Sequence, residues 1–192
     1  MENPVKKVNN PCGFAYFSTL EQVKAAGKNV EKILVPFKIA AKTLDLFPEK
    51  TVACLPRVFF GRDEELFAKL TELKAKGLKK VSCSTLDAVN IARRAGLPFM
   101  MGCGSNVFNY QSVLQYRALG AEEILLSPEL TLMQASALGG DRLGLITYGK
   151  LPLMITRNCP VKNGKACADC GSKSVLIDRM GISFPVICGE GY

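Results

Sequence analysis

The sequence predicts an α/β fold in which parallel strands alternate with helices. Short apolar runs recur along the chain, with segments of helical character between them. The runs are rich in Val, Ile, Leu and Phe and do not alternate strictly with polar residues, which is typical of strands buried on both faces of a parallel sheet. The six runs are KILVPF (32–37), TVACLPRVFF (51–60), KKVSCS (79–84), PFMMGC (98–103), EILLSP (123–128) and RLGLITYG (142–149).

The segments between these runs carry helix signals. Ser18 and Glu21 have the spacing of a capping box. Asp63 is placed to cap a helix that ends at Gly77. Two further helices are expected at 87–95 and 110–119, each followed by a glycine. Strand, helix and strand in repeated succession indicate right-handed βαβ units.

Six such strands form either an open doubly wound sheet or most of a barrel. An open sheet that binds a dinucleotide is expected to carry G-x-G-x-x-G after a strand, and GCGSN (102–106) lacks the third glycine. We therefore predict a partial (β/α)8 TIM-like barrel of about six parallel strands at 32–150, after a lead-in segment at 1–31 and before a cysteine-bearing segment at 151–192. Six strands do not close such a barrel, so we expect a fragment of a longer chain, or pairing with strands of another copy.

Composition limits the classes of function. The 192 residues include 25 Lys and Arg against 17 Asp and Glu, and the net charge of +8 favours a polyanionic partner such as RNA. Many of the lysines are spread along helix faces, where they mainly solvate the surface. The N-terminus lacks the apolar core of a signal peptide, and no run approaches the roughly 18 apolar residues of a membrane span. We expect a cytoplasmic protein without a membrane span, and the oligomeric state stays open.

The chain contains no histidine. This absence excludes Ser-His and Cys-His nucleophilic pairs within these residues, and also the histidine ligands of most catalytic zinc sites.

Polar residues where strands end are the candidates for catalysis, because the loops after parallel barrel strands carry the active site. These residues are Arg57, Ser82, Ser84, Ser105, Asn106, Glu129 and Tyr148. The catalytic candidates among them are Glu129, Arg57 and Tyr148. Structural alternatives exist for several: Ser84, Asn109 and Ser127 are placed to cap helices. Arg57 is placed to pair with Asp63 or Glu64, and Glu129 to complement a helix dipole.

The eight cysteines fall into two groups. Cys12, Cys54, Cys83 and Cys103 are dispersed, three of them in or beside apolar runs, and buried core thiols are the expected reading for such residues. Cys159, Cys167, Cys170 and Cys188 instead form C-x7-C-x2-C-x17-C in a polar segment. Without a secretion signal, this spacing indicates a metal or cluster site rather than disulfides. Spacing alone leaves zinc and an iron-sulfur cluster open, because one C-x2-C pair with two isolated cysteines occurs for both.

The segment around these cysteines resembles the collagenase-like peptidase family U32. The similar stretches are ITYGKLPLM (146–154), RNCP (157–160), the C-x2-C pair, LIDRMGISFPV (176–186) and Cys188, with weaker likeness at VACLPRV (52–58) and ALGAEEILLSPEL (118–130). The resemblance covers about 32–192.

The resemblance implies an incomplete (β/α)8 barrel followed by a cluster-binding segment. Members of the family are named as peptidases, and several resemble iron-sulfur proteins of oxygen-independent hydroxylation that act on RNA or a ubiquinone precursor, with prephenate as an implicated oxygen source. It therefore favours a 4Fe-4S cluster held by Cys159, Cys167, Cys170 and Cys188, with zinc as the alternative. The implied functions are RNA or quinone-precursor hydroxylation, a collagenase-like peptidase, or a non-catalytic zinc-knuckle module. The implied partners are RNA and prephenate or another small molecule.

Overall fold

The computed structural model describes residues 12–156, 159–160 and 174–187. The chain divides into two compact units, Met1–Thr147 and Tyr148–Tyr192. The strands and helices of the sheet described below all lie in the first unit.

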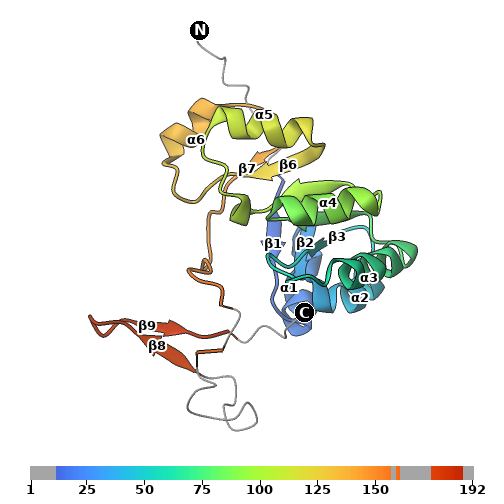
Figure 1. The fold of residues 1–192 in the computed structure, drawn as a ribbon, viewed down its shortest axis with the longest axis horizontal. Coiled ribbons are helices and arrows are strands. Elements are labelled where there is room, and N and C mark those ends of the chain that lie inside the picture. The colour runs from blue at the N-terminus through green and yellow to red at the C-terminus, as the bar shows by residue number, and fades with distance from the viewer. Residues whose placement is uncertain (1–11, 157–158, 161–173, 188–192) are drawn as a thin grey trace. The chain divides into compact units, whose positions relative to one another are not determined.

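The first unit is built on a curled, all-parallel sheet whose seven strands follow one another in chain order (Figure 1). An open doubly wound sheet would reverse its strand order partway, so the sequential order confirms the prediction of a partial barrel. The strands are β1 (Phe14–Tyr16), β2 (Lys32–Pro36), β3 (Thr51–Cys54), β4 (Lys80–Cys83), β5 (Phe99–Met101), β6 (Ala121–Leu125) and β7 (Leu143–Gly144).

The sheet contains one strand that the sequence analysis did not predict. β1 pairs in parallel with β2, with Phe14 opposite Lys32 and Tyr16 opposite Leu34. The segment read as a lead-in at 1–31 thus contributes an edge strand to the sheet. Two predicted strands are shorter than their apolar runs: the run at 51–60 forms a strand only to Cys54, and the run at 142–149 only at Leu143–Gly144.

Helices connect successive strands, and their ends correct several predicted caps. Thr19 and Gln22 form the capping box of the first helix, not Ser18 and Glu21. Asp63 is the first residue of its helix rather than the cap. The helices are α1 (Leu20–Ala26), α2 (Phe37–Leu46), α3 (Asp63–Ala75), α4 (Leu86–Arg94), α5 (Tyr110–Ala118) and α6 (Leu132–Leu138).

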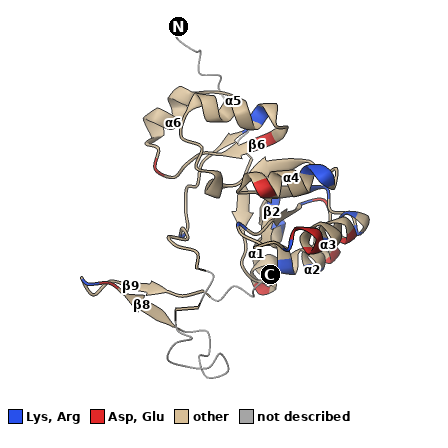
Figure 2. Ribbon diagram, viewed as in Figure 1, with Lys and Arg blue, Asp and Glu red and all other residues tan. Residues whose placement is uncertain are grey.

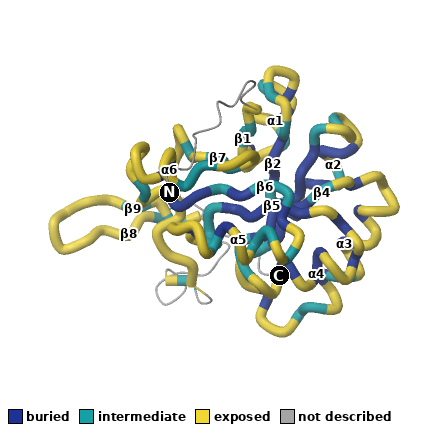
Figure 3. The backbone as a smooth tube through the Cα atoms, turned by 90° about the horizontal axis from the view of Figure 1, so that it is seen from above, coloured by how far each residue is buried: buried dark blue, intermediate teal, exposed yellow. Residues whose placement is uncertain are grey.

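Burial on both faces of the strands explains why the apolar runs do not alternate. In the barrel unit, buried residues follow the central strands (Figure 3). On one face, Leu34, Val52 and Met100 form a buried cluster. On the other face, the fully buried Ile33 lies close beside Gly27 and Phe47, which flank the first two helices. The strands therefore read as continuous apolar segments.

The second unit contains an antiparallel hairpin of β8 (Val175–Ile177) and β9 (Ser183–Pro185). The pairing extends beyond the strands, because the backbone N–H of Val186 donates to the carbonyl of Ser174 at 2.8 Å. At the turn, the carboxylate of Asp178 accepts from the backbone N–H groups of Met180 and Ile182. The hairpin thus joins the two stretches of chain that lead to Cys170 and Cys188.

Charged residues do not gather on one element. Figure 2 shows Lys and Arg distributed over several helices and strands with Asp and Glu near them. This distribution agrees with the expectation that most lysines solvate the surface. Among the described residues, no helix is both long and apolar enough to cross a membrane.

Candidate functional site

Three successive βα loops meet at the carboxyl ends of β3, β4 and β5. Arg57 lies in the loop after β3, Ser82 and Ser84 lie at the end of β4, and Gly102–Ser105 form the loop after β5. The strand register places Cys54 opposite Ser82 and Ser82 opposite Met100. The structure therefore brings together the residues that the sequence predicted at these three strand ends.

Two glycines allow the loop after β5 to approach its neighbours. A Cβ atom at Gly102 would lie 2.6 Å from Ser84 Oγ and 3.0 Å from Ser82 Oγ. A Cβ atom at Gly104 would lie 2.8 Å from Ser84 Cβ and 2.9 Å from Arg57 Nε. A larger residue at either position would force these neighbouring side chains to shift, because the contacts would be shorter than ordinary van der Waals distances. The partial dinucleotide motif GCGSN thus has a packing role at the sheet edge.

The loop after β5 is fixed by its own hydrogen bonds. Ser105 Oγ donates to the carbonyl of Gly102 at 2.7 Å, and the backbone N–H of Gly102 donates to the carbonyl of Cys83 at 2.7 Å. Asn106 adopts a left-handed conformation with φ of 48°, which closes the short 3₁₀ turn at Cys103–Ser105. The helix that follows, α5, is capped by the side chain of Asn109, which lies after this loop. This cap is one of the structural roles that the sequence predicted.

Two thiols near this edge, those of Cys54 and Cys83, are not activated nucleophiles. Burial raises the pKa of the Cys54 thiol to about 12, although a hydrogen bond with Ser82 acts in the opposite direction. Burial likewise raises the pKa of Cys83 to about 12. Both thiols are therefore protonated at neutral pH. Cys83 is buried, as expected for a core thiol, whereas Cys12 is exposed.

The raised thiol pKa values predict a loss of stability at alkaline pH. Below about pH 9, both folded and unfolded states keep these protons; between about pH 9 and 12 only the unfolded thiols ionise, so stability falls as pH rises. The expected slope is about 1.4 kcal/mol per pH unit for each thiol. Urea unfolding from pH 8 to 11 under reducing conditions measures this slope of the unfolding free energy against pH. The double variant Cys54→Ala, Cys83→Ala is expected to show a shallower decline, and an unchanged slope would contradict the assignment.

Tyr16 is a residue of this edge that sequence reasoning missed. It ends β1, and desolvation raises the pKa of its phenol to about 12, with a smaller contribution from Cys54. The phenol is therefore a neutral hydrogen-bond donor at physiological pH. The signal in the sequence is only the short apolar run GFAYF (13–17), which is too brief for a periodicity argument.

The remaining catalytic candidates lie apart from this cluster of side chains. Glu129 is exposed and follows β6, and its backbone N–H donates to Ser127 Oγ at 3.2 Å. It precedes the residue that caps α6, Thr131, so Glu129 is not in a first helical turn and the helix-dipole reading is wrong. Tyr148 belongs to the second unit and is 97% exposed.

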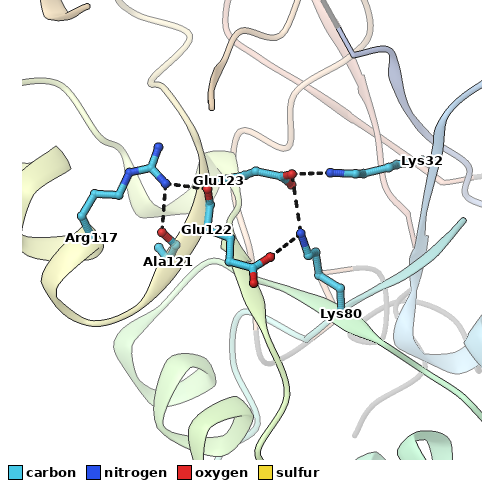
Figure 4. Close-up of polar contacts among 6 residues, drawn as sticks. All are labelled: Lys32, Lys80, Arg117, Ala121, Glu122 and Glu123. Atoms are coloured by element: carbon cyan, nitrogen blue, oxygen red, sulfur yellow. Dashed lines mark hydrogen bonds and ion pairs between the residues drawn. The ribbon is translucent and has the colours of Figure 1, made fainter. Parts of the chain in front are cut away.

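A second polar cluster lies at the opposite, amino ends of the strands (Figure 4). Glu123 of β6 accepts from Lys32, the first residue of β2, and its Oε1 lies 3.5 Å from Nζ of Lys80, the first residue of β4. Lys80 also pairs with Glu122 at 2.6 Å, and this hydrogen bond lowers the pKa of the Glu122 carboxyl. Lys32 in addition stacks over the Phe14 ring at 4.5 Å. Because the amino ends of barrel strands serve stability, we assign this cluster a structural role.

Of the four predicted cluster ligands, only Cys159 belongs to the described residues, where it is partly buried with a free thiol. Cys167, Cys170 and Cys188 lie outside the described residues. Within the described part of the chain, no group of three or more Cys, Asp or Glu residues is arranged to hold a metal ion.

Comparisons with known proteins place the fold. No family model matches the sequence, and no curated protein matches it. Among solved structures, the chain is similar to the U32 peptidase Mk0906, with a TM-score of 0.54 and 13% sequence identity. The match covers 69% of this chain and 66% of that one, so the chain spans about two thirds of its structural neighbour. At this identity the similarity shows a shared fold: the partial α/β barrel of this chain is similar in fold to that U32 peptidase.

Proposed function

We propose that the chain is an iron-sulfur protein that supports oxygen-independent hydroxylation of RNA or of a quinone precursor. The observation that carries this proposal is a set of four thiols, in a chain without histidine, directly following a barrel with the fold of a U32 peptidase. The proposed ligands are Cys159, Cys167, Cys170 and Cys188.

The donor set fits an iron-sulfur cluster. Four cysteine thiolates are the ligands that 4Fe-4S clusters take. The hydrogen bond between Val186 and Ser174 closes the hairpin, and Cys170 lies four residues before Ser174 while Cys188 lies two residues after Val186. The hairpin therefore pairs two described residues that lie, in the sequence, between the two cysteines of the C-x17-C spacing. The cationic residues that flank the cysteines in the sequence would offset thiolate charge.

The cluster, when bound, supplies single electrons to a substrate. Within the barrel unit itself, the edge is suited to hold a substrate, because Arg57 and Ser84 face the loop after β5 at the carboxyl ends of the strands. The protonated thiols of Cys54 and Cys83 and the phenol of Tyr16 add no negative charge there. The net charge of +8 supports an RNA substrate, although no single element concentrates it.

Mass spectrometry of cellular products tests the proposal. Cells that lack the gene for this chain are compared with cells that carry it, and both RNA nucleosides and quinones are analysed for species heavier by one oxygen atom. We expect one hydroxylated nucleoside, or one hydroxylated quinone, to disappear on deletion and to return with the wild-type gene but not with Cys159→Ser. If all hydroxylated nucleosides and quinones persist in the deletion strain, the proposal is wrong.

A peptidase is the second candidate, favoured by the name of the structural neighbour. Its difficulty is the nucleophile: the chain has no histidine, and the pKa values of Cys54 and Cys83 at the barrel edge are raised rather than lowered. The peptidase reading predicts gelatin hydrolysis that survives in Cys159→Ser after its metal is lost. The iron-sulfur reading predicts no such hydrolysis.

A further inference from the structure

Arg57 is a cationic residue of the barrel edge, and its side chain is exposed. Its guanidinium packs against the backbone of Gly104, where a Cβ atom would lie 2.9 Å from Nε and 3.2 Å from Cζ. Within the described residues no carboxylate forms an ion pair with it: Glu64, a partner expected from the sequence, pairs instead with Arg94 at 2.9 Å.

A serine hydroxyl lies beside this guanidinium, because Ser84 is partly exposed at the end of the neighbouring strand β4. Gly102 packs closely against the same strand end, since a Cβ atom there would lie 2.6 Å from Ser84 Oγ and 3.0 Å from Ser82 Oγ. Ser84 also contacts the Gly104 position, at 2.8 Å from its Cβ atom. Ser84 therefore stands between the two glycines, on the same side of the loop as Arg57.

The groups at this edge favour a negatively charged ligand. A guanidinium offers several N–H donors in a planar fork that matches an oxyanion, and serine hydroxyls add further donors. The neighbouring Cys54 thiol is protonated at neutral pH, so it adds no repelling charge. The location is the carboxyl edge of a parallel sheet, where barrels and open α/β sheets both bind their ligands.

We propose that Arg57, Ser84 and the backbone of Gly102–Gly104 form a binding site for the oxyanion group of a small molecule, either a carboxylate or a phosphate. The site belongs to the barrel unit, and it does not depend on whether the cysteines of the second unit bind a cluster. The proposal names the chemical class of the ligand, an oxyanion, whereas the fold alone indicates only where a ligand binds.

Titration of the full-length protein with two probes tests the site. Inorganic phosphate and malonate are added separately at constant ionic strength, and binding is followed by calorimetry or by NMR shifts. We expect saturable binding of at least one probe; binding of phosphate only or of malonate only identifies the natural oxyanion. Arg57→Ala is expected to weaken binding about tenfold or more, as for loss of a charged hydrogen-bond donor.

The matched control is Arg93→Ala, which removes the same charge from an exposed position in the last turn of α4. It is expected to change affinity by less than about twofold, because exposed charges are screened by salt. Equal weakening by Arg57→Ala and Arg93→Ala would overturn the proposal, as would the absence of saturable binding of either probe to the wild-type protein.

A second pair of variants tests the site without removing charge. Gly104→Ala places a methyl group against Arg57 and Ser84 and is expected to abolish saturable binding. Gly13→Ala is its control, since a Cβ atom at Gly13 meets nothing within 4 Å. Circular dichroism and the thermal midpoint establish that both variants are folded. A folded Gly104→Ala variant that binds either probe as the wild type does would contradict the site; if Gly104→Ala does not fold, the comparison of Arg57 with Arg93 decides alone.

Discussion

Cys159→Ser is expected to remove most of the bound iron and the visible absorption of the anaerobically purified protein. The proposed cluster takes its ligands from four thiols, and serine replaces a soft thiolate by a hydroxyl that binds iron poorly. Cys159 belongs to the second unit, so the barrel is expected to keep its circular dichroism spectrum and thermal midpoint. Iron analysis and absorption spectra measure the loss.

Cys12→Ser is the matched control for this variant. Cys12 is an exposed thiol in the first unit and is not among the proposed ligands. It is expected to retain iron and colour at the wild-type level. Equal iron in both variants would show that Cys159 is not a ligand.

Glu123→Ala is expected to lower the free energy of unfolding by about 2–3 kcal/mol, because it removes the carboxylate that two partly buried ammonium groups share. The side chain of Glu123 is 13% exposed, and those of Lys32 and Lys80 are 25% and 19% exposed. Without Glu123, the two lysines face each other with little water to solvate them. Urea unfolding at pH 7 measures the loss.

Two comparisons separate this effect from a general loss of charge. Glu122→Ala removes the more exposed partner of Lys80 and is expected to cost only about 0.5 kcal/mol, as exposed ion pairs do. The double variant Lys32→Met, Glu123→Leu replaces charge by apolar volume and is expected to recover much of the stability lost in Glu123→Ala. Similar losses in Glu122→Ala and Glu123→Ala would contradict the assigned role of the cluster.

The barrel was predictable because buried parallel strands leave a strong local signal. Short runs rich in apolar residues, such as KILVPF and PFMMGC, mark strands covered on both faces. β1 left no such signal, because it has only three residues and only pairing with β2 identifies it. The cap of the first helix lies one residue after its predicted position. Ser18 and Thr19 are adjacent hydroxyl residues, and the local sequence favours neither of them as the cap.

The candidate site was predictable only where a rule of topology applies. Arg57, Ser82 and Ser84 follow strands, and parallel strands place their carboxyl ends together. The ion pair between Lys32 and Glu123 joins residues 91 positions apart, so no local pattern indicates it. The packing role of Gly102 and Gly104 likewise depends on neighbouring strands. The cluster ligands stay a prediction from spacing and resemblance.

The central claim is that the four cysteines after the barrel hold an iron-sulfur cluster, and metal analysis of the anaerobically purified wild-type protein tests it most directly. We expect a brown protein with broad visible absorption and about four iron and four sulfide per chain. A colourless protein with one zinc per chain and no sulfide would contradict the claim and favour a structural zinc site.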